Sequence, residues 1–142
     1  MIILDTNVIS ELMLPEPSQT VIAWLDQQNS MSLYTTAVTA AELRAGVALL
    51  PDGKRRKVLD QYVEDVLGDY FDLRILPFDV NASPPYAEIL ACRRSAGRPI
   101  HTADAQIAAI ARTHSAPMAT RNSKDFDGLG LSLIDPWTPT PT

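Results

Sequence analysis

Residues 2–12 read IILDTNVISEL, and this opening predicts how the chain begins to fold. The apolar run 2–4 is typical of a buried strand, and Asp5-Thr6-Asn7 directly after it is typical of a helix start. A strand that passes at once into a helix favours a fold in which strands and helices alternate. Asp5 then stands at the carboxyl end of the first strand.

The alternation continues through the rest of the chain. Apolar runs with strand character recur, and stretches with helical spacing of apolar residues separate them. We therefore predict an α/β fold with a central, mainly parallel sheet of about five strands and helices on both faces. The further strands are expected at 32–36, 73–78, 117–120 and 132–134, and the helices are expected to begin at Ser18, at Thr39 in a capping box with Glu42, at Lys54, at Ser83 as cap and at Thr102 as cap.

The composition is that of one globular domain. The chain has 142 residues, of which 46% are hydrophobic, and 12 Lys+Arg against 17 Asp+Glu give a formal net charge of −5. Residues 1–135 are predicted to form a single domain, and residues 136–142 a Pro/Thr-rich C-terminal tail that lies loose on the surface. The single cysteine excludes an internal disulfide, and neither a signal peptide nor an apolar run of ~18 residues is found. We expect a cytoplasmic protein that does not contact a membrane.

Acidic and amide side chains are expected to meet at one edge of this sheet, because ligands of parallel sheets bind beyond the carboxyl ends of the strands. Asp5 ends the first strand and Glu42 lies in the helix after the second. Asn122 and Asp125 follow the fourth strand, and Asp104 lies in the helix that leads into it. Carboxylates gathered in one crevice repel unless a divalent cation lies between them, and Mg²⁺ prefers such oxygen ligands.

Each acid also has a structural explanation. Glu42 completes a capping box with Thr39, and Asp104 lies in the first turn of a helix, where an acid stabilises the macrodipole. Asp5 fits a simple N-cap, and Asp125 lies in a polar turn, where aspartate is common. The spacing of these residues alone leaves the structural and the metal-binding interpretations open.

Other chemistries find less support in the sequence. No GxGxxG follows a strand and no GxxxxGK[ST] is present, which argues against dinucleotide and P-loop functions. Cys92, His101 and His114 are not spaced like a zinc site. An Asp after the first strand also fits a haloacid-dehalogenase-like phosphohydrolase, but that chemistry typically needs a second Asp where this chain has Asn7.

Four blocks carry a family resemblance: ILDTNVISEL at 3–12, TAAELRAG at 39–46, IHTADAQIAAIA at 100–111, and ATRN at 119–122 followed by Asp125-Phe126. In this order they resemble the PIN-domain family and, more narrowly, the VapC/FitB type of toxin from bacterial toxin–antitoxin pairs. The closing IDPW at 134–137 is also similar to the FitB-like group. The resemblance spans essentially the whole chain.

The resemblance implies a compact three-layer α/β/α fold and cleavage of RNA phosphodiester bonds by metal-activated water, with Mg²⁺ or, as a substitute, Mn²⁺. Asp5, Glu42 and Asp104 occupy the positions of the family's metal-binding catalytic acids. The family often has a fourth acid where this chain has Asn122. We retain Asn122 as a catalytic candidate, because its amide can still bind water or phosphate, although it carries one negative charge fewer.

Four neighbouring residues are candidates for supporting roles. Asn7 either orients a water molecule or is an ordinary helix-start amide, and Thr6 is expected to be a capping hydroxyl. Asp125 lies three residues beyond Asn122. Arg121 is a candidate for contact with RNA.

The resemblance further implies a homodimer held by apolar helix faces, which a cognate antitoxin binds in a larger assembly and which contacts DNA only through that antitoxin. The leading hypothesis is a metal-dependent endoribonuclease toxin of a type II toxin–antitoxin module, with an RNA substrate of the tRNA or rRNA class. The alternative is a weakly active subunit, impaired by Asn122, that acts mainly in an antitoxin-containing regulatory complex on DNA.

Overall fold

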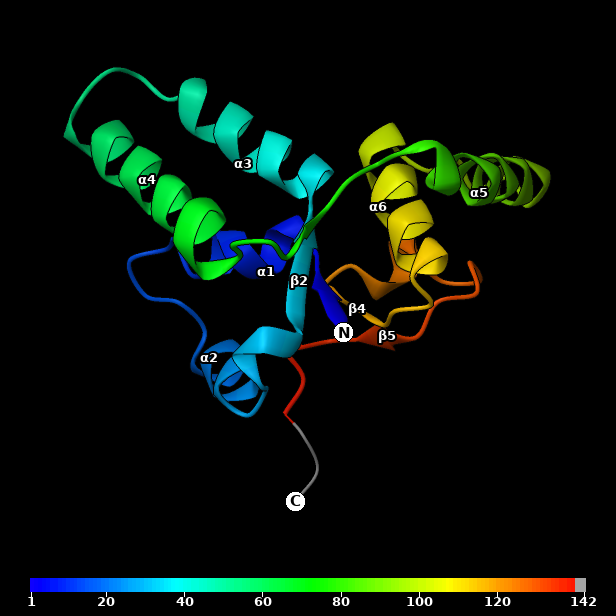
Figure 1. The fold of residues 1–142 in the computed structure, drawn as a ribbon, viewed down its shortest axis with the longest axis horizontal. Helices are drawn as coiled ribbons and strands as arrows, with labels where there is room; N and C mark the ends of the chain where they lie inside the picture. The colour runs from blue at the N-terminus through cyan, green and yellow to red at the C-terminus, as the bar shows by residue number, and fades with distance from the viewer. Residues whose placement is uncertain (140–142) are drawn as a thin grey trace.

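A parallel sheet of five strands forms the centre of the molecule (Figure 1). The computed structural model describes residues 1–139. Each strand pairs in parallel with its neighbours, as the alternation in the sequence predicts, and the strands lie in the order β3-β2-β1-β4-β5. The strands are β1 (Ile2–Leu4), β2 (Leu33–Thr36), β3 (Ile75–Leu76), β4 (Met118–Ala119) and β5 (Leu133–Ile134).

Helices cover both faces of this sheet, which makes a three-layer α/β/α fold. Figure 1 shows α5 and α6 packed together on one side, and the α3–α4 pair reaching away on the other. The helices are α1 (Thr6–Glu11), α2 (Gln19–Asp26), α3 (Ala37–Ala48), α4 (Lys54–Asp65), α5 (Ser83–Ser95) and α6 (Thr102–Thr113). A π-helical turn, η2 (Val66–Tyr70), extends α4, and the 3₁₀ turns are η1 (Ser30–Ser32), η3 (Val80–Ala82) and η4 (Ser123–Asp125).

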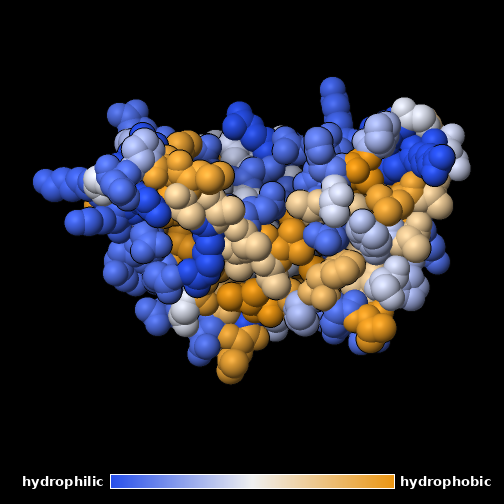
Figure 2. Space-filling model, turned by 90° about the horizontal axis from the view of Figure 1, so that it is seen from above, coloured by the Kyte–Doolittle hydropathy of each residue, from blue (hydrophilic) through white to orange (hydrophobic). Residues whose placement is uncertain are grey.

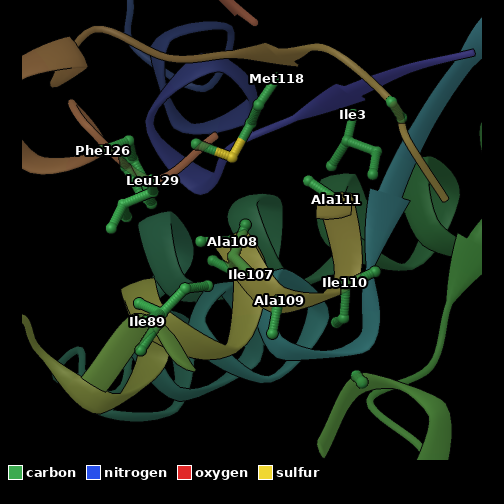
Figure 3. Packing of buried hydrophobic residues seen from close by; sticks show 13 residues of the cluster. Ile3, Ile89, Ile107, Ala108, Ala109, Ile110, Ala111, Met118, Phe126 and Leu129 are labelled. Atoms are coloured by element: carbon green, nitrogen blue, oxygen red, sulfur yellow. The ribbon is translucent and has the colours of Figure 1, made fainter. Parts of the chain in front are cut away.

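The alternation of side chains along each strand divides the core in two. Ile3 and Met118 point to a first cluster, which contains the buried residues of α5 and α6, and Figure 3 shows them above the apolar side of α6. Leu4 and Ala119, the next residue of each strand, point to a second cluster with residues of α1, α2, α3 and α4. Because neighbouring residues of a strand face opposite ways, two apolar residues in a row are buried on two faces.

The start of α3 differs from the predicted capping box. Thr36 is the N-cap of this helix, and its hydroxyl accepts a hydrogen bond of 3.1 Å from the backbone N–H of Thr39. Glu42 therefore lies more than a turn inside the helix, beyond reach of a capping interaction. The capping-box interpretation of Glu42 is wrong, because a threonine three residues earlier already satisfies the helix end.

Two other predicted caps are also wrong. Ser83 is already helical, since η3 leads directly into α5, and its hydroxyl donates to the carbonyl of Val80. Thr102 is the first residue of α6, and the N-cap is His101, which makes no capping bond through its side chain. Asp104 does lie in the first turn of α6, as predicted.

The C-terminal end is more closely packed than its composition suggested. Pro136 is buried and Trp137 packs against the second core cluster, so the segment does not lie loose from residue 136 onward. The last part of the expected tail, 140–142, lies outside the described residues. Among residues 1–139, no helix combines the length and the apolar composition needed to cross a bilayer.

Candidate active site

Asp5 lies at the carboxyl end of β1 and is buried, with only 4% of its surface exposed. One carboxylate oxygen, Oδ1, accepts a 2.8 Å hydrogen bond from the backbone N–H of Thr6 and so caps α1. The other, Oδ2, accepts from the hydroxyl of Thr120 at 2.8 Å and from the side-chain amide of Asn7 at 3.3 Å. Asp5 is thus both an N-cap and the centre of a polar network.

The network does not fully offset the cost of burial. Burial raises the pKa of Asp5 from 3.8 to about 6, against the opposing effect of its hydrogen bonds with Thr120 and Thr6. The negative charges of Asp104 and Glu42 raise this pKa further. Acids that lie far apart in the sequence therefore act on one another at this edge of the sheet.

Asp104 belongs to the same group of charges. Partial burial is the largest cause that raises the pKa of its carboxyl, followed by the negative charges of Glu42 and Asp125, and His101 opposes them. Asp125 is exposed on η4, in the loop after β4. The structure thus brings together the acids predicted from the sequence.

Thr6 positions the third carboxylate. Its hydroxyl donates a 2.7 Å hydrogen bond to Oε1 of Glu42 and lies 3.0 Å from the hydroxyl of Thr39. The expectation that Thr6 is a capping hydroxyl is wrong, because Asp5 caps α1. Thr6 instead links α1 to α3 and fixes the side chain of Glu42, which is otherwise exposed.

Thr120 is a site residue that sequence reasoning missed. It is fully buried after β4, and its hydroxyl accepts hydrogen bonds from the amide of Asn7 and from the backbone N–H of Asn122, while it donates to Asp5. A polar residue directly after β4, which pairs with β1, was the available signal.

Asn122 and Arg121 take up different positions around this network. Among residues 1–139 the side chain of Asn122 makes no hydrogen bond, and its backbone leads into η4. The backbone N–H of Arg121 donates to Oδ1 of Asn7 at 3.3 Å, and its side chain is exposed. Asn7 therefore connects Asp5 to the chain after β4.

None of the three acids forms an ion pair within the described part of the chain. The ion pairs found among residues 1–139 are Arg44–Glu64, Arg56–Asp52 and Arg112–Glu88, and none includes Asp5, Glu42 or Asp104. Hard oxygen ligands with unopposed negative charge suit a divalent cation. Within the same residues, however, no three His, Cys, Asp or Glu side chains lie close enough together to form a metal-binding group. The acids interact electrostatically, but their carboxyl groups do not converge on one position in the described structure.

An apolar pocket lies outside the group of acids, since none of Asp5, Glu42 and Asp104 lines it. It encloses about 640 Å³ between α1, α2 and the end of α4, and its lining is mostly apolar. Figure 2 shows that apolar surface also crosses the top of the molecule between hydrophilic regions. The pocket is lined by Leu4, Ile9, Leu12, Leu25, Tyr62, Asp65, Val66, Asp69, Tyr70 and Phe71.

Comparison with known proteins identifies the family of the chain. The PIN domain family matches residues 2–130. VapC ribonuclease Y4jK of Sinorhizobium fredii is 45% identical, over 98% of this chain and 99% of its own length. Toxin FitB of Neisseria gonorrhoeae is 44% identical, over 96% and 99%.

A solved structure extends the comparison to three dimensions. The structure of FitAB bound to an IR36 DNA fragment contains a chain that is 42% identical and superimposes with a TM-score of 0.92, with 99% of both chains covered. Sequence and fold therefore agree over nearly the whole length. The chain belongs to the PIN-domain family, in the group that includes the VapC and FitB toxins.

Proposed function

We propose that this protein is the toxin of a type II toxin–antitoxin module and that it acts as a metal-dependent endoribonuclease. The observation that carries the proposal is the meeting of Asp5, Glu42 and Asp104. The charges of Asp104 and Glu42 raise the pKa of Asp5, the charge of Glu42 raises the pKa of Asp104, and none of the three acids forms an ion pair within residues 1–139. A relative named as a ribonuclease, 45% identical over 98% of this chain, supports the reaction.

Asp5, Glu42 and Asp104 would hold the cation, Mg²⁺ or in its place Mn²⁺. When bound, such an ion lowers the pKa of water and stabilises charge on the phosphate and the departing oxygen. The chain prepares the ligands: Thr120 holds Oδ2 of Asp5, and Thr6 holds Oε1 of Glu42. Because these donors fix the carboxylates before substrate arrives, less ordering is needed when it binds.

The substrate proposed is RNA of the tRNA or rRNA class. The chain is acidic overall, with a net charge of −5, so general attraction does not bring a polyanion to it. Binding must therefore depend on local donors, and a bound cation strengthens it. Arg121 and the amide of Asn122 stand at the edge of the site and are suited to a phosphate and to a water molecule respectively.

The proposal includes a cognate antitoxin and a homodimer. The large apolar pocket beside the site and the exposed apolar surface support contact with other chains. The similar FitAB structure is bound to DNA, which supports a larger assembly in which the antitoxin contacts DNA.

A second function is favoured by one observation, the amide at position 122. If the missing acid impairs catalysis, the protein acts mainly in an antitoxin-containing regulatory complex on DNA. Asn122→Asp decides between the two: a large gain in RNA cleavage supports impairment, and unchanged cleavage supports an enzyme that is complete as it stands.

The direct test is incubation of purified, antitoxin-free protein with total RNA, with and without Mg²⁺. We expect discrete fragments only with the metal, none from Asp5→Ala, and parental cleavage by Asp26→Ala, which removes an exposed acid at the end of α2. Equal cleavage by Asp5→Ala would remove Asp5 from the mechanism.

A further inference from the structure

Trp137, near the C-terminus, is fixed against the first helix of the chain. Its indole Nε1 donates a 3.3 Å hydrogen bond to Oε1 of Glu11, at the end of α1. Its backbone N–H donates to Oδ1 of Asp135 at 2.9 Å, and its ring packs against the second core cluster. The indole is therefore held on both its polar and its apolar side.

The Arg121 side chain lies over this ring. The guanidinium carbon is 5.1 Å from the ring centroid, within the range of a cation–π interaction. Arg121 is exposed and takes part in none of the ion pairs found in residues 1–139. Stacking restricts the guanidinium but uses none of its N–H donors, so these remain available to a ligand.

The stacked arginine stands next to the acids. Arg121 directly follows Thr120, whose hydroxyl binds Asp5, and the Asn7 side chain joins Asp5 to the backbone of Arg121. An arginine so close to carboxylates would ordinarily be drawn to them. Because the guanidinium stacks on Trp137, Arg121 forms no ion pair with these acids. Its planar N–H donors match the oxygens of a phosphate.

We propose that Trp137 is a positioning residue of the nucleic-acid site, holding Arg121 where the arginine binds a phosphate of the RNA strand next to the bond that is cut. The inference rests on the proposed function, since it assumes that RNA is the ligand. It makes residues 135–137, from the far end of the chain, part of the substrate site.

The test measures RNA binding apart from cleavage. A fluorescein-labelled single-stranded RNA oligonucleotide is titrated with each variant at low ionic strength in EDTA, and fluorescence anisotropy reports the affinity. Arg121→Ala should weaken binding about tenfold, as expected for loss of a charge-assisted contact. Its salt dependence should also fall by about 0.7 in log–log slope, the contribution of one single-strand phosphate.

Trp137→Leu should weaken binding about threefold, through loss of the cation–π contact. Trp137→Phe keeps a ring face and should stay close to the parent. Because Trp137 acts through the arginine, Trp137→Leu should add nothing in an Arg121→Ala protein. Arg94→Ala, which removes an equal charge from an exposed position of α5, is the matched control and should leave binding nearly unchanged.

A second measurement tests the inference without Trp137→Leu, in case that variant fails to fold. The chain has two tryptophans, so in Trp24→Phe the fluorescence reports Trp137 alone. RNA should change its emission, and Arg121→Ala should remove that change at the same RNA concentration.

Four results would overturn the inference: parent protein that does not bind the oligonucleotide, equal loss in Arg94→Ala and Arg121→Ala, additive losses in the double variant, or normal binding by both Trp137→Leu and Arg121→Ala. These are distinct from failure of the proposed function. A parent that cleaves RNA while Trp137→Leu and Arg121→Ala bind normally refutes only the inference, and binding that depends on Arg121 in a parent that never cleaves refutes only the nuclease.

Discussion

Two buried charged side chains, Arg74 and Asp5, have opposite electrostatic surroundings. Arg74, 7% exposed, lies in the loop after η2 and donates to the backbone carbonyls of Ser30, Leu33 and Tyr70. Its guanidinium also lies within 5.5 Å of the centroids of the Tyr70 and Phe71 rings. Asp5 has hydrogen-bond donors as well, but the charges nearest to it are negative, and its pKa is raised to about 6.

The difference separates structure from function. A buried charge surrounded by groups of opposite polarity joins elements of the fold, as Arg74 joins η1, β2 and η2. A buried charge among like charges stores free energy that a cation can release. On this criterion we propose that Asp5 belongs to a cation-binding site, whereas Arg74 joins elements of the fold.

The largest expected effect comes from removing the hydrogen bonds of Arg74. Arg74→Met should lower the free energy of unfolding by about 3 kcal/mol, because it leaves buried carbonyls without a donor. Urea denaturation followed by circular dichroism measures it. Arg94→Met, at an exposed position, is the control, and a loss for Arg74→Met no greater than for this control would contradict the structural role of Arg74.

Removing the charge of Asp5 should have the opposite sign. Because the folded pKa of about 6 exceeds the ordinary value of 3.8, the folded protein binds the proton more tightly than the unfolded chain, and Asp5 destabilises the fold as pH rises between these values. Two pH units correspond to about 3 kcal/mol, and lost hydrogen bonds offset about 1. Asp5→Asn should therefore stabilise the metal-free protein by about 2 kcal/mol above pH 6.

Denaturant titrations at several pH values check this. The gain should vanish below about pH 4, where the carboxyl is protonated in both states. Excess Mg²⁺ should stabilise the parent alone. Destabilisation by Asp5→Asn at pH 7 without metal would mean that the carboxylate is structurally satisfied, as Arg74 is.

Thr120→Val should have a smaller effect. It removes a hydroxyl that lowers the pKa of Asp5, so that pKa should rise further. The variant should lose about 1 kcal/mol of stability at pH 7, the ordinary contribution of one hydrogen bond. NMR titration of the Asp5 carboxyl carbon measures the pKa directly, and an unchanged or lower value would refute the role given to Thr120.

The smallest effect concerns the backbone that leads to Arg74. Leu73 has a φ of 62° and is 95% exposed, so it bears left-handed strain without burying its side chain. Leu73→Gly should relieve that strain and, after the entropy of the unfolded glycine is counted, stabilise the protein by up to about 1 kcal/mol. Thermal unfolding measures the change. Leu49→Gly, at a position that is also highly exposed but has a right-handed backbone conformation, is the control and should give no gain.

Local pattern predicted most of the fold. The apolar runs at β1 and β2 and the helical spacing of apolar residues between the strands were sufficient for the alternation of strands and helices along the chain, because burial and backbone preference act within a few residues. The cap at Thr39 was wrong because several hydroxyl residues precede α3, and spacing does not decide which one takes the N-cap. The cap at Ser83 was wrong because η3 runs directly into α5, so that Ser83 is already helical.

The site was predicted less completely. Asp5, Glu42 and Asp104 were candidates from the sequence because chemistry and family resemblance pointed to the same acids, and in the structure the charges of Asp104 and Glu42 act on Asp5. Thr120 was not, since its importance depends on β4 lying beside β1, a contact between residues more than a hundred positions apart. The stacking of Arg121 on Trp137 also depends on tertiary packing, in this case that of the C-terminal segment against the chain after β4.

Titration with Mn²⁺ by calorimetry tests the central claim most directly, namely that Asp5, Glu42 and Asp104 together bind a divalent cation. The parent should bind Mn²⁺, and Asp5→Asn, Glu42→Gln and Asp104→Asn should each weaken binding strongly, while Asp26→Asn should bind like the parent. Equal Mn²⁺ binding by the parent and all three site variants would show that these carboxylates do not form a metal site.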